Sequence, residues 1–195
     1  GAQMLAKSLG GTVGKNSDNS YEIGFFDIVP TKIGNKMFEK QKTFFQWHNE
    51  GFNVPKECLV LAEGKKFRQQ AFKFNNAFGL QFHPEVNLKL HLLWIYYTLM
   101  LNPHKLKDKG TQSIYKQLAK RIKHDYRIKN WLDDFLDNYL LNQVGWSLST
   151  LRSIRKPIAN KTKSDAIPIF WEEKIYEIVP NRTGPKKAVT FPENE

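Results

Sequence analysis

The chain has 195 residues, of which 41% are hydrophobic, so it holds enough apolar material for one packed domain and a tail. Its formal net charge of +11 is spread out, with +3 over residues 1–86, +5 over 87–143 and +3 over 144–195, whereas a nucleic-acid site usually concentrates Lys and Arg on one stripe. The single cysteine excludes an intramolecular disulfide, and the most apolar segment, residues 92–101, is shorter than the roughly 20 residues of a membrane span. We therefore expect a soluble, cytoplasmic protein that binds no specific nucleic acid and no membrane.

The first 86 residues predict one short helix followed by strands. Residues 1–9 form a helical pattern that Gly10 and Gly11 would stop. Asn75 and Asn76 suit a tight hairpin turn, because Asn tolerates a positive φ. Strands are expected at residues 12–15, 21–30, 43–48, 58–62, 69–74 and 77–82, with loops at 32–42 and 49–55.

After residue 86 the hydrophobic period changes from two to about 3.6, which indicates helices. One helix is expected at residues 88–101, ended by Asn102-Pro103, with its aromatic residues in the core. Residues 111–142 predict further helix, whose basic stretch at 116–129 is interpreted as a solvated face, with an acidic partner as the sharper alternative. We place a domain over residues 1–143 and a loosely ordered basic extension over 144–195, with a short strand at 174–179.

His83 and Glu85 stand on either side of Pro84, directly after a predicted apolar strand. In an extended segment, residues two apart point the same way. A carboxylate held beside an imidazole fixes its tautomer and stabilises the imidazolium, as acyl-transfer chemistry requires. Taken alone, the His-Pro-Glu sequence is more often a loop histidine beside a surface glutamate.

The other titratable candidates carry weaker signals. Cys58 has no glycine-rich elbow around it and enters an apolar strand, so we interpret it as a small buried hydrophobe. His91, His104 and His124 show no metal-ligand spacing. We expect no metal and no cofactor.

Six short motifs occur in a fixed order, and together they resemble those of the class I glutamine amidotransferases, in the branch similar to the amidotransferase domain of GMP synthase. The resemblance covers roughly residues 1–101 and continues weakly to about residue 140. The motifs are Gly1-Ala2-Gln3, Tyr21-Glu22-Ile23-Gly24, Phe45-Gln46-Trp47-His48, Phe52-Asn53-Val54-Pro55, Gln70-Ala71-Phe72 and the block from Gly79 to Glu85.

This resemblance implies an α/β fold with a mostly parallel central sheet flanked by helices, as in flavodoxin-like proteins. The chain would supply the C-terminal portion of that fold, incomplete at the N-terminus, together with a helical C-terminal region. The nucleophile elbow of the family would place a cysteine two residues before Gly1.

The resemblance also implies a chemistry for individual residues. His83 and Glu85 would be the catalytic base and the carboxylate that orients it. Gln3, Trp47, His48 and Asn49 would bind the substrate glutamine, although a structural role for His48 is an equal alternative. The ammonia released would pass to a synthetase partner, and the chain by itself would be inactive without the cysteine. A γ-glutamyl peptide hydrolase and a non-catalytic binding protein are the alternatives.

Overall fold

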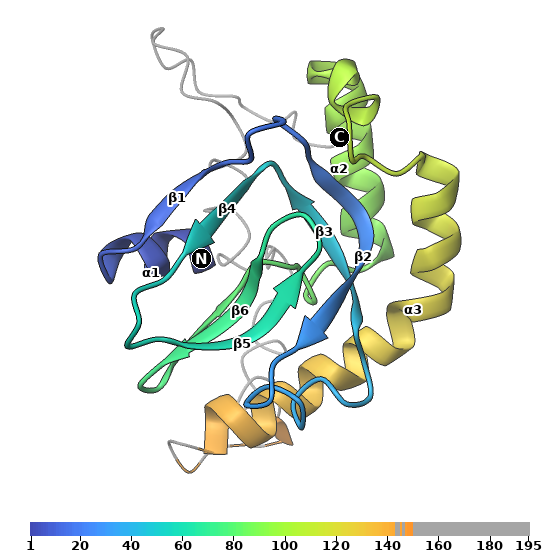
Figure 1. The fold of residues 1–195 in the computed structure, drawn as a ribbon. Helices are drawn as coiled ribbons and strands as arrows, with labels where there is room; N and C mark the ends of the chain where they lie inside the picture. The colour runs from blue at the N-terminus through green and yellow to red at the C-terminus, as the bar shows by residue number, and fades with distance from the viewer. Residues whose placement is uncertain (143–144, 146, 150–195) are drawn as a thin grey trace, which may run out of the picture. The chain divides into compact units, whose positions relative to one another are not determined.

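The strands that the structure describes lie between residues 12 and 80, where aromatic and β-branched residues alternate with polar ones in short runs. In the computed structural model, which describes residues 1–142, 145 and 147–149, these runs make two sheets (Figure 1). The larger sheet has the strand order β3-β2-β5-β6-β7, and the smaller one pairs β1 with β4. The strands are β1 (Thr12–Lys15), β2 (Glu22–Pro30), β3 (Thr43–His48), β4 (Glu50–Asn53), β5 (Leu59–Gly64), β6 (Gln69–Phe74) and β7 (Ala77–Leu80).

The expectation of a mostly parallel sheet is wrong for these strands, because every strand pair in the described residues is antiparallel. A single isolated bridge, between Ile23 and Thr111, is parallel. Parallel neighbours need a crossover, usually a helix, that returns the chain to the same end of the sheet. In the described part of the chain, helix α1 (Ala2–Ser8) precedes the strands and helix α2 (Leu88–Leu101) follows them, so no helix separates two strands.

The hairpin predicted at Asn75 is confirmed. Asn75 has φ +49° and joins β6 to β7, whose register pairs Phe74 with Ala77. Asparagine reaches this left-handed region at a lower cost than most residues, because its short polar side chain can hydrogen-bond locally. The tight turn brings the end of β7, and therefore the His-Pro-Glu segment, back beside β6.

Residues 50–53 were expected in a loop and instead form β4. This strand pairs with β1 in a register that sets Thr12 opposite Asn53 and Lys15 opposite Glu50. Its sequence contains Gly51 and Asn53, residue types that are depleted in strands, so local propensity did not indicate it. The pairing partner lies about forty residues earlier, and only the folded chain brings the two segments together.

The predicted helices are present, and two of them begin at caps that were not predicted from the sequence. Gly10 follows α1 with φ +89°, a conformation that glycine adopts without strain. Asn87 caps α2 by accepting a hydrogen bond from the backbone N–H of Leu90, and Ser113 caps the next long helix through Lys116 N–H. The elements after α2 are a 3-10 turn (Pro103–Leu106), helix α3 (Ile114–Phe135) and a π-helical segment (Leu136–Leu141).

Two apolar clusters lie on different parts of the sheets. The first joins β2 and β3 to α3 and includes Phe25, Phe45 and Trp131. The second packs Ala6 of α1 against Phe72 and its neighbours. In Figure 1 the helices α2 and α3 lie on the side of β2 and β3, whereas α1 lies beside β1 and β4. The His-Pro-Glu segment therefore leaves the sheet between the strands and α2.

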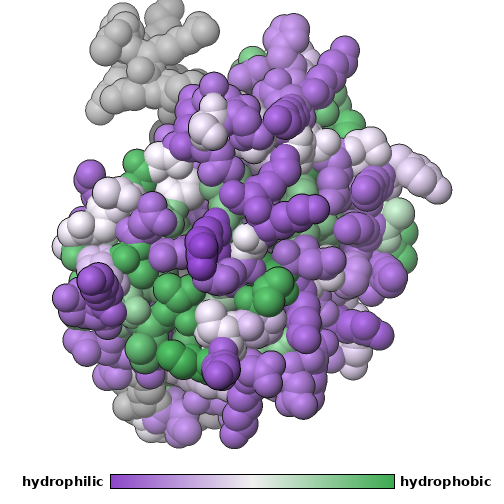
Figure 2. Space-filling model, viewed as in Figure 1, coloured by the Kyte–Doolittle hydropathy of each residue, from purple (hydrophilic) through white to green (hydrophobic). Residues whose placement is uncertain are grey.

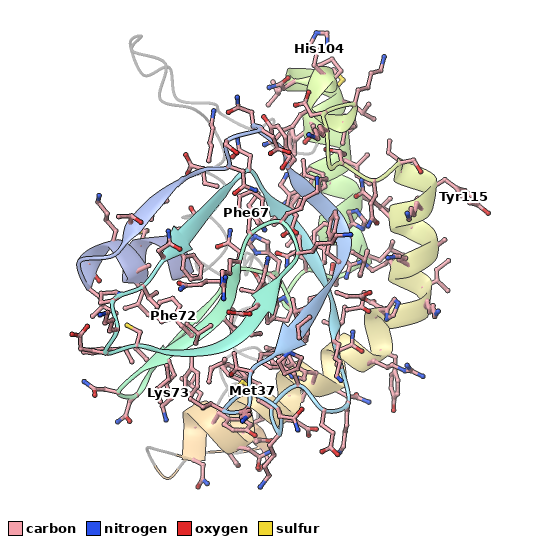
Figure 3. The ribbon with its side chains drawn as sticks, in the orientation of Figure 1. Met37, Phe67, Phe72, Lys73, His104 and Tyr115 are labelled. Atoms are coloured by element: carbon pink, nitrogen blue, oxygen red, sulfur yellow. The ribbon has the colours of Figure 1, made fainter. Side chains whose placement is uncertain are left out.

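The two long helices correct two expectations about exposure. Tyr96 and Tyr97 of α2 were expected in the core but are 56% and 46% exposed. The basic stretch of α3 was expected to be solvated, yet Gln117 and Arg121 are buried there. Figure 3 shows Tyr115, on the same helix, directed away from the sheet. On the face shown in Figure 2, hydrophilic residues cover most of the surface and apolar residues gather over β5 and its neighbours.

Residues Gly1–Leu148 make one compact unit. The expected extension over residues 144–195, with its short strand at 174–179, lies outside the described residues apart from positions 145 and 147–149. Within the described range, no helix has the length and apolar content needed to cross a membrane.

Candidate active site

His83 and Glu85 form a direct pair at the end of the larger sheet. His83 Nδ1 lies 2.9 Å from Glu85 Oε1, and the side chains are 23% and 28% exposed. The backbone N–H of His83 donates to the Phe45 carbonyl of β3 at 2.8 Å. Pro84 and Glu85 form a turn, so the extended geometry expected for this segment is wrong. The turn still places the carboxylate beside the imidazole, and it leaves Nε2 as the ring nitrogen that does not face Glu85.

One tryptophan contacts the His83 ring, and a second packs behind the first. Trp94 of α2 meets it edge to face, with ring centroids 5.3 Å apart and an angle of 90°. Trp47 of β3 contacts Trp94 at 5.6 Å between centroids. Trp47 was expected to line the substrate pocket, and it lies one aromatic ring away from His83. Trp94 was expected only as a core residue, although its contact gives His83 a partly apolar wall.

Three other motif residues meet at one backbone carbonyl. The Glu50 carbonyl oxygen accepts hydrogen bonds from Gln3 Nε2 at 3.0 Å and Gln81 Nε2 at 2.7 Å, and His48 Nδ1 lies 2.9 Å from it. Gln3 belongs to α1, and Gln81 precedes His83 by two residues. The Glu50 carbonyl therefore ties the first helix to the segment that carries His83.

A buried polar network continues from His48. Gln46 Nε2 donates to Gln70 Oε1 at 2.7 Å, so Gln46 turns its oxygen toward His48 Nε2 at 3.0 Å. Gln70 Nε2 donates to Glu22 Oε2 at 3.0 Å, and the same oxygen lies 3.3 Å from His48 Nε2. Both nitrogens of His48 thus face oxygen atoms inside the protein. Glu22 is buried beside this ring.

These contacts define where the expected substrate residues lie. His48 uses both ring nitrogens inside the protein, and Gln3 donates to the Glu50 backbone. Asn49 is half-buried at the single-residue connection between β3 and β4. The structure brings Gln3, His48 and the His83 segment together, with Trp47 nearby.

Cys58 is structural in its surroundings. It is 7% exposed and belongs to the second apolar cluster with Ala6 and Phe72. Burial raises the pKa of its thiol, with a smaller contribution from Glu57. A thiol in an apolar site is held as the unreactive SH form, so the interpretation of Cys58 as a small hydrophobe fits its position.

The described residues also form a groove away from this pair. A groove of about 670 Å³ opens between the loop around Lys36 and Lys40 and the end of α3, and its lining includes neither His83 nor Glu85. Across the described positions, no group of three or more His, Cys, Asp or Glu is arranged to hold a metal ion.

The family model for class I glutamine amidotransferases matches residues 1–96, which contain the whole arrangement around His83. Residues 1–96, just under half of the chain, therefore match the class I glutamine amidotransferase family. The chain is 35% identical over 89 residues to a subunit of the glutamine-hydrolysing GMP synthase of Saccharolobus solfataricus, covering 44% of this chain and 47% of that one. It is 27% identical over 88 residues to the GMP synthase of Macrococcus caseolyticus, covering 44% of this chain and 17% of that one. The chain is therefore GMP synthase-like.

Solved structures agree with this assignment. A glutamine amidotransferase from Thermotoga maritima superposes with a TM-score of 0.57 and 30% identity, over 68% of this chain and 56% of that one. A glutamine amidotransferase from Methylobacillus flagellatus, at 21% identity and a TM-score of 0.58 over 67% of this chain and 55% of that one, supports the fold. The α/β fold class of the family is confirmed. The chain spans about half the length of the first of these curated relatives and of these structures.

Sequence reasoning missed several residues of this region. Gln46 and Gln70 stood out only as members of motifs, and Glu22 only as part of a strand, yet they form the buried network beside His48. A signal existed, since polar residues inside apolar strands are buried only when they find partners. Arg121 carried no such signal, because it stands among other basic residues of a surface-like helix.

Proposed function

We propose that this chain carries the base and the orienting acid of a glutaminase that hydrolyses the side-chain amide of glutamine. The observation that carries the proposal is the 2.9 Å contact between His83 Nδ1 and Glu85 Oε1 at the end of a sheet of the class I amidotransferase fold. The nucleophile would be a cysteine two residues before Gly1, at the start of α1.

In the proposed reaction, His83 Nδ1–H donates to Glu85, which leaves the lone pair of Nε2 for the thiol proton. The thiolate attacks the carboxamide carbon of glutamine, and the C–N bond breaks as the proton on Nε2 moves to the departing ammonia. His83 then takes a proton from water, whose oxygen attacks the thioester carbon, and the proton returns to the departing sulfur. One glutamine and one water give one glutamate and one ammonia.

The hydrogen bonds to the Glu50 carbonyl support this arrangement, because they join residues that the proposal places near the nucleophile and the substrate. Gln3 would stand one turn after the nucleophile, and its hydrogen bond to Glu50 O at 3.0 Å joins that helix to Gln81. Trp47 of β3 and Asn49, the residue that follows this strand, would contact bound glutamine. His48 would act indirectly, through its contact with the Glu50 carbonyl. The 195-residue chain alone is proposed to be inactive, because its one thiol, Cys58, is buried.

The test compares glutamine hydrolysis by the protein expressed from its entire reading frame with that of His83→Ala and Glu85→Gln variants. General base catalysis is worth about 10²–10⁴-fold, so kcat should fall by about that factor in His83→Ala and by less in Glu85→Gln. Cys58→Ala is the matched control and should keep the parent rate. Equal rates in the parent protein and His83→Ala would contradict the proposal.

The relative from Saccharolobus solfataricus is named as one subunit of a GMP synthase that hydrolyses glutamine. We propose that the ammonia formed here likewise passes to a synthetase partner. If so, glutaminase activity should rise when the partner is added, whereas an unchanged rate across partner concentrations would favour hydrolysis as the end product. Hydrolysis of γ-glutamyl dipeptides in preference to glutamine would instead indicate a peptide hydrolase.

A further inference from the structure

Arg121 is a buried cation in the middle of α3. It is 1% exposed, and its guanidinium packs against two neighbouring phenylalanine rings, 4.8 Å from the centroid of Phe25 and 4.7 Å from that of Phe45. Cation–π contacts of this kind recover part of the cost of taking the charge out of water. Burial lowers the pKa of Arg121, and the Asp125 carboxylate opposes that shift.

The hydrogen bonds of Arg121 reach the segment that follows His83. Its Nη1 donates to the Val86 carbonyl at 2.6 Å and to Asp125 Oδ1 at 2.9 Å. Its Nε points to Nδ1 of the buried His91 at 3.4 Å. Among the described residues Nη2 has no hydrogen-bond partner, which costs about 1–3 kcal/mol.

The tautomer of His91 fits this role for Arg121. Gln117 Nε2 donates to the Gln112 carbonyl at 2.7 Å, so Gln117 turns its oxygen toward His91 Nε2 at 2.9 Å. The proton of His91 is therefore on Nε2, and Nδ1 is an acceptor for Arg121. Burial lowers the pKa of His91 to about 4, which keeps the ring neutral beside the guanidinium near pH 7.

Arg121 contacts both attachments of the His-Pro-Glu turn. On one side, its charge rests on the ring of Phe45, whose carbonyl accepts the His83 N–H at 2.8 Å. On the other side, it holds the carbonyl of Val86, the residue after Glu85. The next residue, Asn87, caps α2, so one guanidinium contacts the turn at both its strand end and its helix end.

We propose that Arg121 is a positioning residue that sets the orientation of His83 relative to Glu85 by holding the turn through Val86. The catalytic importance of this role rests on the proposed function, whereas the contacts of Arg121 with the turn come from the structure. An apolar side chain would attach α3 to the sheet without the desolvation cost of a buried charge. A hydrogen bond to the Val86 carbonyl requires a donor at this position, and the planar guanidinium also packs on the ring of Phe45.

The experiment uses Arg121→Met, which keeps much of the volume and removes the donors, and Arg121→Lys, which keeps the charge. Ile128→Val is the matched control, because Ile128 is 1% exposed on the same helix and lies in the first apolar cluster. The first measurement, on the 195-residue chain, is the NMR signal of the His83 ring proton that is shared with Glu85. The second, on the protein from the entire reading frame, is kcat and KM for glutamine.

Arg121→Met should broaden or shift the His83 ring signal and lower kcat about 10- to 100-fold with KM within about twofold, because small misplacements of reacting groups cost up to about 100-fold. Arg121→Lys should restore part of both. Ile128→Val should lose stability and leave both readouts unchanged. If Arg121→Met folds and matches Ile128→Val in both readouts, the inference is overturned, and if the Met variant does not fold, the Lys variant decides in the same way. Failure of the proposed function would show instead as a normal rate in His83→Ala, while the NMR measurement would still decide the role of Arg121.

Discussion

Single polar residues carry much of the organisation near His83, because burial makes each of them depend on a partner. His91 is fully buried, and its neutral ring accepts from Arg121 and donates to Gln117. Such a ring stabilises the fold only while it stays uncharged. The protein should therefore be sensitive to acid at His91, a residue for which the sequence showed only that metal-ligand spacing is absent.

The free energy of unfolding should decrease as the pH is lowered, because His91 is buried in its neutral form. Its native pKa of about 4 lies below the usual 6.5, so between these values the unfolded state binds a proton that the native state does not. The stabilising contribution is full above about pH 6.5 and is lost as the pH falls to about 4, at most about 3 kcal/mol in total. Urea unfolding of the parent chain and of His91→Gln at pH 7 and pH 4.5 measures this difference.

His91→Gln should show the smaller loss of unfolding free energy between the two pH values. His124, whose pKa burial also lowers, is present in both chains and cancels from the comparison. An identical pH dependence in the two chains would show that His91 takes up its proton in the native state.

At the scale of elements, the connection from β7 to α2 decides where His83 lies. Three sets of hydrogen bonds hold this connection. The His83 N–H donates to the Phe45 carbonyl, the Val86 carbonyl accepts from Arg121, and Asn87 caps α2. The cap matters because the first turn of a helix leaves backbone N–H groups without partners. Asn87 satisfies one of them, at Leu90, at a distance of 3.0 Å.

Replacing Asn87 by Ala should lower the unfolding free energy by about 1 kcal/mol, because the Leu90 N–H loses its acceptor. Asn87→Ser is the control, since serine is an equally good cap and should stay close to the parent. Chemical denaturation followed by tryptophan fluorescence measures both. Identical midpoints for the Ala and Ser variants would argue that solvent replaces the cap without cost.

At the scale of the molecule, α3 holds the loop between β2 and β3 against the larger sheet through Trp131. Its indole N–H donates to the Met37 carbonyl at 2.7 Å, and its ring stacks on Phe38 at 5.4 Å between centroids. It also meets Phe44 edge to face at 4.8 Å. One side chain thus joins α3 to a loop and a strand that lie much earlier in the sequence.

Trp131→Ala should lower the unfolding free energy by about 3–5 kcal/mol, through lost burial, the cavity left behind and the unpaired Met37 carbonyl. Tyr115→Ala on the same helix is the control, because Tyr115 is 85% exposed and points outward in Figure 3. Its effect should stay within about 0.5 kcal/mol. Thermal unfolding followed by circular dichroism measures both, and equal losses would contradict the central place of Trp131.

Local chemistry explains which parts of the fold and site were predictable. Helix 88–101 was found at its observed ends because the hydrophobic period changes after residue 86 and Asn102-Pro103 marks the stop, and the β6–β7 hairpin because Asn75 suits its positive φ. The motif block ending in Glu85 singled out the His83 pair for the same reason. Strand β4 and the network of Glu22 with Gln70 could not be found this way, because their partners lie tens of residues away.

The sequence by itself determined the periodicity of the elements, the turn and cap residues and the family motifs, since each depends on residues that are close along the chain. Only the tertiary structure decided that the strands pair antiparallel, that the His-Pro-Glu segment is a turn, and that Arg121 is buried beneath it. Those outcomes depend on which distant surfaces meet when apolar area is removed from water. Arg121 of α3 becomes part of the candidate site only because the folded chain packs Phe25 and Phe45 against it and brings the Val86 carbonyl within hydrogen-bond distance.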